Sequence, residues 1–199
     1  AKAPTVQKLD QDAAAVILLN ENLTEVLWAK RNPKLKFLGG FHGFAGGKVE
    51  ASDDLTEVRN YDENVEMKKF IACAAREMFE EIGILLVRNG DKLTVGQRKS
   101  LHDDLISGRN TFAEILEFWN LWIDAEDFTY TGFWTTPEFS PIRFKTHFFI
   151  AVCPNKQTPY QAITEMQNIE FIEFQKALES WKTSKVLIAP PVLISLRAL

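Results

Sequence analysis

Cysteine and histidine are rare in this sequence of 199 residues, and positive charge is not in excess. The two cysteines, Cys73 and Cys153, and the three scattered histidines form neither a CxxC motif nor the His cluster of a zinc site. Two cysteines do not make a disulfide scaffold, so both are expected to be small buried hydrophobic residues. The formal net charge of −4 argues against nonspecific binding to nucleic acid or to an anionic membrane.

Long apolar runs are also lacking. None approaches the roughly 20 residues that a transmembrane helix needs, and no signal peptide is recognisable, so a reducing cytoplasmic setting is expected. The remaining composition is ordinary for a globular protein, with 46% hydrophobic and 25% charged residues, and fifteen Phe and five Trp are available for a core. The length suits one domain, and we expect residues 1–199 to form it.

Hydrophobic spacing predicts a mixture of strands and helices after a polar arm at residues 1–12. Apolar runs predict strands at 13–19, 25–31, 84–87, 133–137 and 141–152, with a short one between 165 and 173. Helical periodicity predicts helices at 67–82, 174–181 and 192–199, and two more within 97–123 that separate near 107–110. The last helix stops abruptly at Leu199, which leaves open whether the native chain continues beyond it.

The predicted helix at 67–82 carries three carboxylates on one face. Glu77, Glu80 and Glu81 stand three and four residues apart, and only Arg76 lies at helical spacing to neutralise Glu80. Such a face is either an ordinary solvated acidic surface or a site for a hard divalent cation, which prefers oxygen ligands. Gly83 is expected to end the helix in a left-handed conformation.

A glycine-rich segment precedes this helix and ends in Phe44-Ala45-Gly46-Gly47-Lys48-Val49-Glu50. Paired glycines let a backbone approach another group closely. The spacing is neither that of a Walker loop nor that of a dinucleotide-binding GxGxxG motif. Neither of these phosphate-binding loops is therefore predicted.

Basic residues gather at two other places. Lys30 and Arg31 end the second predicted strand. Arg143, Lys145 and His147 alternate along the strand at 141–152, which predicts that they share one face. Each group is either a solvated surface or part of an anion-binding site.

Gly47, Asp53 and the run from Arg76 to Ile84 together resemble the signature of the Nudix hydrolase family. That signature is glycine, five residues, glutamate, seven residues, and then Arg-Glu-apolar-x-Glu-Glu-x-Gly-apolar. The second half is matched completely, and Asp53 stands at the position of the first glutamate. The separation of Asp53 from Arg76 is 22 residues instead of seven, which an insertion in the loop before the helix explains.

The resemblance implies the Nudix fold, of the α/β (α+β) class, with a mixed central β-sheet between helices and insertions at about 54–66 and 97–123. A narrower resemblance is to the peroxisomal coenzyme A diphosphatases and their bacterial relatives. These proteins share the loop insertion, the extra helices and segments similar to Trp134–Pro137 and Arg143–Phe149. The glycine segment departs from that branch, since Ala45 stands where its members usually have proline. Such domains also occur fused to a second hydrolase-like domain.

Nudix enzymes hydrolyse a diphosphate linked to another group, and residue matching implies which side chains act here. Mg²⁺ or Mn²⁺ would be held by Glu77, Glu80 and Glu81, while Arg76 fixes the geometry of a carboxylate. Asp53 is expected to do the same or to join the outer metal shell. The general base often lies outside the signature in this family, and Glu165 is the first candidate, with Glu138 the second.

Substrate contacts are expected from residues outside the helix. Arg143, Lys145 and Lys30 or Arg31 are candidates for phosphate contacts, and the Gly46–Gly47 backbone is expected to border the substrate. Phe44 and Trp134 either stack on a base or pack in the core. The expected partner is a small-molecule nucleoside diphosphate derivative, with a homodimer left open and with neither nucleic acid nor membrane.

Three functions are weighed on these residues. The first is metal-dependent hydrolysis of coenzyme A or an acyl-coenzyme A, which releases an adenosine bisphosphate and a phosphopantetheine product. The second is the same chemistry on ADP-ribose, a nucleotide sugar or a dinucleoside polyphosphate. The third is a noncatalytic Nudix domain that senses a nucleotide, against which the three intact glutamates argue.

Overall fold

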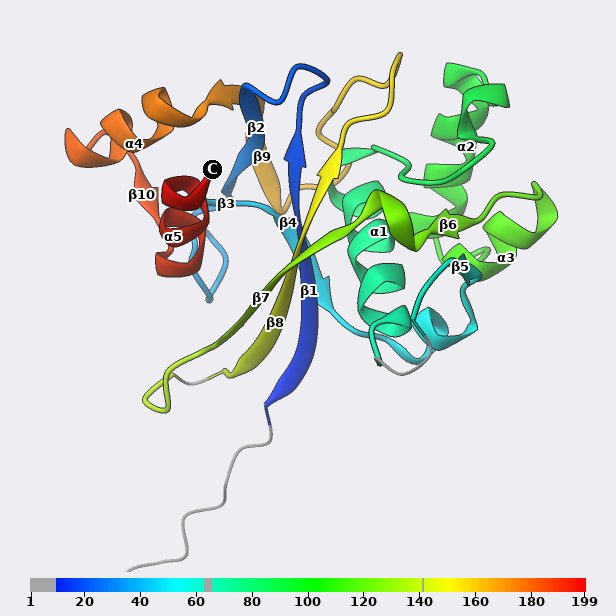
Figure 1. The fold of residues 1–199 in the computed structure, drawn as a ribbon, viewed down its shortest axis with the longest axis horizontal. Coiled ribbons are helices and arrows are strands. Elements are labelled where there is room, and N and C mark those ends of the chain that lie inside the picture. The colour runs from blue at the N-terminus through cyan, green and yellow to red at the C-terminus, as the bar shows by residue number, and fades with distance from the viewer. Residues whose placement is uncertain (1–9, 63–65, 141) are drawn as a thin grey trace, which may run out of the picture.

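The computed structural model describes residues 10–62, 66–140 and 142–199. Its centre is a mixed eight-stranded β-sheet with helices on both faces (Figure 1), as the sequence predicts. The main path of the sheet runs β10-β3-β2-β1-β8-β7, while β4 pairs with β1 and β9 pairs with β2. Its strands are β1 (Gln11–Leu19), β2 (Glu25–Arg31), β3 (Phe41–Gly43), β4 (Ala45–Lys48), β7 (Thr129–Thr135), β8 (Phe144–Val152), β9 (Met166–Glu173) and β10 (Leu187–Ile188).

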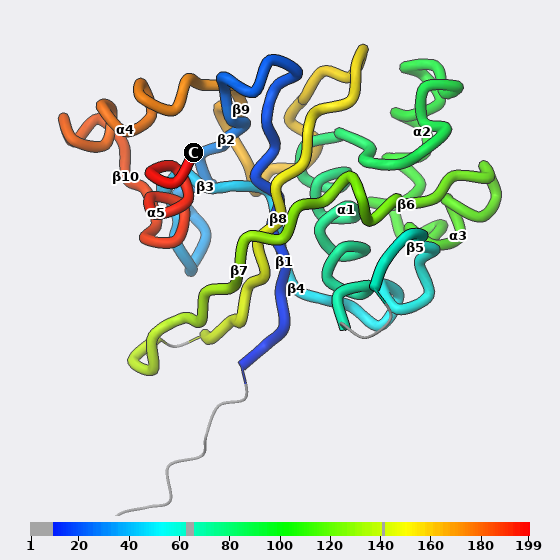
Figure 2. The backbone as a smooth tube through the Cα atoms, in the orientation of Figure 1, coloured from blue at the N-terminus to red at the C-terminus, as the bar shows by residue number. Residues whose placement is uncertain are grey.

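The helices form two groups on opposite sides of the sheet. Figures 1 and 2 show α1, α2 and α3 together on one side, with α4 and α5 on the other. Their bounds are α1 (Lys68–Ile82), α2 (Val95–Ile106), α3 (Phe112–Phe118), α4 (Phe174–Lys182) and α5 (Pro190–Ala198). None of the helices in the described ranges is long and apolar enough to cross a membrane.

The central strand β1 is buried on both faces. Its even-numbered residues from Ala14 to Leu18 join a hydrophobic cluster with α1, and its odd-numbered residues from Ala15 to Leu19 join a second cluster with α4 and α5. One edge of β1 pairs in parallel with β8 along its whole length. The other edge pairs first with β4 and then with β2. The sheet therefore divides at this edge, and the glycine segment lies where it divides.

The prediction of a strand at 84–87 is wrong. Residues 84–86 are buried, but the structure assigns them no strand. The Leu85 N–H instead donates to Oε1 of Gln157 (2.8 Å), and Nε2 of Gln157 donates to the Leu85 carbonyl (2.9 Å). One side-chain amide thus satisfies the backbone groups that a neighbouring strand would otherwise satisfy. An apolar run predicts burial, but it does not show which partner the backbone has.

The two predicted insertions pack against each other. β5 (Val58–Arg59) pairs in parallel with β6 (Ile123–Asp124), and the Arg59 guanidinium lies over the Trp122 ring, 4.0 Å from its centroid. The two helices predicted within 97–123 are confirmed, but α3 ends at Phe118. Asn120 has a φ of 50°, which a continuing helix does not accommodate. Residues 63–65, within the first insertion, and 1–9, within the polar arm, lie outside the described residues.

The predicted strand and helix boundaries differ mainly at glycine and proline. α5 begins at Pro190 and not at 192, because proline suits the first turn of a helix. The short strands β3 and β4 were not predicted, since both lie in the glycine-rich segment. The strand expected at 141–152 begins at Phe144, and Pro141 lies outside the described residues.

Candidate active site

Helix α1 ends as its sequence predicts. Gly83 has a φ of 76°, and its N–H donates to the Phe79 carbonyl (2.9 Å). A Cβ at this position would collide with the Tyr160 ring, so glycine is required for both its backbone conformation and the packing over it. The Tyr160 N–H also donates to the Ile82 carbonyl (3.0 Å). The end of α1 is therefore held by the loop that precedes β9.

Arg76 is the centre of the carboxylate cluster. Its side chain is 3% exposed and makes a two-point ion pair with the fully buried Asp53, at 2.8 Å from Nε and 3.1 Å from Nη2. Its Nη1 donates to Glu77 (2.9 Å) and to Glu80 (3.1 Å). Its Nη2 also donates to the Lys48 carbonyl in β4 (2.9 Å). Arg76 therefore links the glycine segment to the helix, and Asp53 acts as its anchor.

Glu81 and Glu77 lie against the glycine pair, Gly46 and Gly47. The Gly46 N–H donates to Oε2 of Glu81 (3.0 Å), and a Cβ on Gly47 would occupy the position of the Glu77 carboxylate. Burial, followed by the negative charge of Glu77, raises the pKa of Glu81 to about 8. Burial also raises the pKa of Glu77 to about 7, with Arg76 opposing the shift and Glu80 adding to it. Burial, and after it the close approach of these carboxylates, thus disfavours their charged forms.

The chemistry of this cluster fits a divalent cation, although the cluster is not a preassembled cage. No group of three or more His, Cys, Asp or Glu residues in the described ranges is already arranged to hold a metal ion. The carboxylates of Glu77 and Glu80 are instead held by Arg76, through ion pairs of 2.9 Å and 3.1 Å. The donors are nevertheless all carboxylate oxygens, and a hard cation would relieve the repulsion between them. Mg²⁺ or Mn²⁺ at Glu77, Glu80 and Glu81 accordingly stays a prediction.

Arg31 and Glu165 lie on the Glu81 side of the cluster. Arg31 pairs with Met166 across β2 and β9, and the Asn32 N–H donates to the Glu165 carbonyl (2.7 Å). Both side chains act electrostatically on Glu81: Arg31 lowers the pKa of that carboxyl, and Glu165 raises it. Glu138, the second candidate for a base, is exposed in the turn between β7 and β8. The structure therefore places Glu165 near enough to Glu81 to raise the pKa of that carboxyl.

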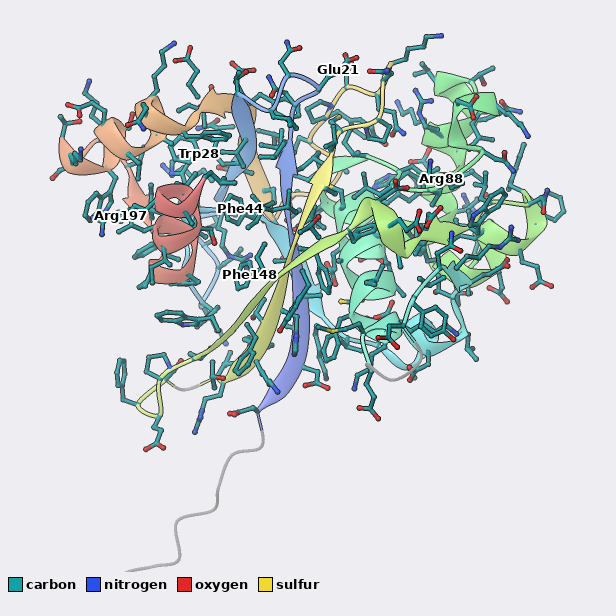
Figure 3. All side chains as sticks on the ribbon, viewed as in Figure 1. Glu21, Trp28, Phe44, Arg88, Phe148 and Arg197 are labelled. Atoms are coloured by element: carbon teal, nitrogen blue, oxygen red, sulfur yellow. The ribbon has the colours of Figure 1, made fainter. Side chains whose placement is uncertain are left out.

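A cavity of about 440 Å³ opens beside the glycine pair. Its walls are mostly aromatic and aliphatic, and they come from the glycine segment, from β1, β7 and β8, and from the start of α5. Figure 3 shows Phe44 and Phe148 on the side of the sheet that faces α5, where both join the second hydrophobic cluster. Among the predicted contacts, those that line this cavity are Arg31, Phe44, Gly46, Gly47 and Trp134.

Lys145 and His147 share one face of β8, as predicted, since both contact the Phe133 ring, but this basic stripe does not border the cavity. Arg143 precedes the strand and pairs with Asp10, 2.9 Å away. Nζ of Lys145 lies 4.6 Å from the centroid of the Phe133 ring, and the buried His147 stacks on Phe70 at 3.9 Å between ring centroids. Neither Arg143 nor Lys145 lines the cavity. Alternation along a strand predicts a shared face, but it does not show what packs on that face.

Several cavity residues carry no signal in the sequence. They come from separate segments and include Phe37, Leu38, Phe41, His42, Phe139, Phe144, Phe148, Pro190, Pro191 and Val192. Their apolar spacing predicts core packing equally well, so only the topology distinguishes them. Two buried atoms of cavity residues, Nε of Arg31 and Nδ1 of His42, have no hydrogen-bond partner in the described chain. Burial lowers the pKa of His42, which favours its neutral form.

Comparison with known proteins places the chain in a family. Residues 9–119, more than half of the chain, match the model of the NUDIX domain. The curated protein "Putative nudix hydrolase 7" from Caenorhabditis elegans is 27% identical over 191 residues, which are 95% of this chain and 60% of that protein. The chain therefore spans less than two thirds of the length of this relative.

Solved structures show the same fold. The crystal structure of a NUDIX hydrolase from Alicyclobacillus acidocaldarius is 25% identical, with a TM-score of 0.81 over 97% of this chain and 92% of that chain. The NUDIX domain of Shewanella oneidensis NrtR, solved with ADP ribose, has a TM-score of 0.53 at 10% identity and covers 98% of this chain and 90% of its own. The second likeness concerns the fold alone.

Proposed function

The chain belongs to the Nudix domain family, and on that premise we propose that it hydrolyses a diphosphate linkage in a nucleoside diphosphate derivative. The observation that carries the proposal is the carboxylate cluster of α1, held by Arg76 and lying against the glycine pair beside the cavity. Hydrolysis of a diphosphate depends mainly on positioning and on charge stabilisation. The carboxylates of α1 are suited to charge stabilisation through a bound cation, and Arg76 is suited to positioning them.

The residues have separate roles in the proposed reaction. Glu77, Glu80 and Glu81 would hold Mg²⁺ or Mn²⁺, which when bound neutralises diphosphate charge and lowers the pKa of water. Glu165 accepts a proton from water as the water oxygen forms a bond to one phosphorus. The bond from that phosphorus to the bridging oxygen breaks, and the bridging oxygen leaves on the other phosphate. Arg76 is a positioning residue, because its hydrogen bonds are to the carboxylates and to Lys48.

Coenzyme A or an acyl-coenzyme A is the proposed substrate, with an adenosine bisphosphate and a phosphopantetheine as products. The apolar lining of the cavity supports this choice over a nucleotide sugar. A sugar buried there would lose the water around its hydroxyl groups without gaining enough hydrogen-bond partners. ADP-ribose and dinucleoside polyphosphates are the other alternative substrates.

A noncatalytic Nudix domain that senses a nucleotide is the alternative of a different class. A site that has lost its activity is expected to lose carboxylates, because nothing then offsets the cost of burying them together. All three glutamates are present here, and Glu81 is buried. We therefore favour catalysis over sensing.

The test is hydrolysis of a substrate panel with Mg²⁺ or Mn²⁺. The panel contains coenzyme A, octanoyl-coenzyme A, ADP-ribose, a nucleotide sugar and a dinucleoside polyphosphate. We expect the coenzyme A compounds to react fastest and a chelator to stop the reaction. Glu81→Gln should lower kcat/KM by about 100-fold or more, because loss of even an outer-shell metal partner costs roughly 10- to 100-fold. Glu117→Gln, which removes an exposed charge from α3, is the matched control.

Three results would contradict the proposal, in different parts. Failure to release product from every compound, or a Glu81→Gln variant as active as the wild type, would overturn the assignment as an enzyme. Preference for a nucleotide sugar over coenzyme A would overturn only the assignment of the substrate.

A further inference from the structure

Phe139 occupies an unusual position at the cavity. It lies in the turn between β7 and β8, it is 91% exposed, and it nevertheless lines the cavity. A single exposed apolar side chain needs no explanation by itself. This one, however, stands beside an opening whose other walls are mostly apolar. A Phe ring in that place gains contact area only when something apolar occupies the cavity.

The other walls of the cavity suit an apolar occupant. Phe37 packs on Phe144 with their ring centroids 5.8 Å apart, which joins the glycine-rich segment to β8. Trp134 lines the cavity from β7, and Pro190 lines it from the start of α5. The aromatic surfaces thus come from elements on more than one side, and they continue to the glycine pair that contacts Glu77 and Glu81. The three glutamates do not themselves line the cavity. A molecule whose diphosphate lies at them can extend its second group past the glycine pair and between these walls.

We propose that this cavity binds an apolar substituent of the substrate and that Phe139 packs over that substituent, which makes Phe139 a specificity-determining residue. The inference rests on the proposed function, since it places the diphosphate at the α1 carboxylates. The ligand class is a diphosphate whose second group carries an aliphatic chain, such as a fatty acyl thioester. Phe139 then discriminates between substrates with this chain and substrates without it.

The test compares Phe139→Ser and Phe139→Leu with Phe118→Ser. Phe118 is a matched control because it is 83% exposed and lies at the end of α3, among residues that do not line the cavity. The measured quantity is the ratio of kcat/KM for octanoyl-coenzyme A to that for free coenzyme A. We expect Phe139→Ser to lower this ratio about tenfold, because covering half of a Phe side chain contributes roughly 1.4 kcal/mol, which is tenfold. The loss should appear in KM and leave kcat nearly unchanged.

The two other variants make the result specific. Phe139→Leu should keep the ratio within about twofold of the wild type, since it keeps an apolar side chain. Phe118→Ser should leave the ratio unchanged. A ratio that stays the same in Phe139→Ser, or that falls equally in Phe118→Ser, would overturn the role of Phe139.

A binding measurement separates this inference from the proposed function. Anilinonaphthalene sulfonate, an apolar dye with one negative charge, is titrated into each protein while its fluorescence is followed. We expect the dye to bind the wild type and Phe118→Ser alike and to bind Phe139→Ser several-fold more weakly. If no coenzyme A compound is hydrolysed but this pattern holds, the proposed substrate fails and the apolar subsite stands. Equal binding to all variants, or no binding to the wild type, would overturn the subsite.

Discussion

The ion pair between Asp53 and Arg76 gives a prediction whose size follows from burial. Asp53→Asn removes the carboxylate that accepts two hydrogen bonds from Arg76 and one from the Glu50 N–H. The Arg76 side chain is 3% exposed, so its guanidinium group cannot be solvated in place of the lost ion pair. Removing one partner of a buried pair costs about 3–5 kcal/mol. Glu77 and Glu80 stay on Nη1, which places the expected loss near the lower end, at about 3 kcal/mol.

The assay is urea unfolding of the wild type, Asp53→Asn and Asp54→Asn. Asp54 is the neighbouring residue and is exposed, so its substitution is expected to change the free energy of unfolding by less than about 0.5 kcal/mol. In a thermal melt, a loss of about 3 kcal/mol corresponds to a fall in Tm of roughly 6–12 °C for a chain of this length. A difference below about 1 kcal/mol between Asp53→Asn and Asp54→Asn would refute the reasoning, since a buried guanidinium without its anchor must be destabilising.

Other predictions concern the end of α1 and the sheet. Gly83→Ala should lower the free energy of unfolding by about 1–2 kcal/mol or more, measured in urea, because it combines a φ of 76° with a collision at Tyr160. Gln157→Ala should cost about 2 kcal/mol or more in the same assay and increase hydrogen exchange at Leu85, whose buried N–H and carbonyl lose their partners. Burial, followed by Lys145, lowers the pKa of His147, so the unfolded state takes up a proton first as the pH falls below about 6.5. The free energy of unfolding of the wild type, minus that of His147→Phe, should therefore be smaller at pH 5.5 than at pH 7.5. A difference that does not change with pH would contradict this.

The part of the site that one element builds was predictable from the sequence. Glu77, Glu80 and Glu81 lie on one helical face, and helical spacing alone predicts that arrangement. The link from Arg76 to Glu80 follows from the same periodicity and is confirmed at 3.1 Å. The link from Arg76 to Asp53 crosses 22 residues; the family signature placed both residues at the site, but their ion pair was not predicted.

The part of the site that tertiary contacts build was not predictable. Phe139 and Pro190 line one cavity, although 50 residues separate them in the chain, and no local pattern encodes that meeting. The same limit explains the error at Leu85, whose partner is a side chain 72 positions away. His147 shares a face with Lys145 as predicted, and its burial against Phe70 depends on how α1 lies across the sheet. Periodicity predicts which residues point the same way, whereas packing decides what they contact.

The anchor between Asp53 and Arg76 also sets how freely the chain between them can vary in length. Extending a flexible loop costs little, since each doubling of its length adds only about 0.6 kcal/mol of closure entropy. With both ends of the loop fixed by one buried ion pair, residues added between them do not move the glutamates of α1 relative to the glycine pair. The reaction centre and the loop can therefore diverge independently. This protein can thus gain or lose segments in the loop, such as β5, while the glutamates of α1 keep their positions relative to the glycine pair.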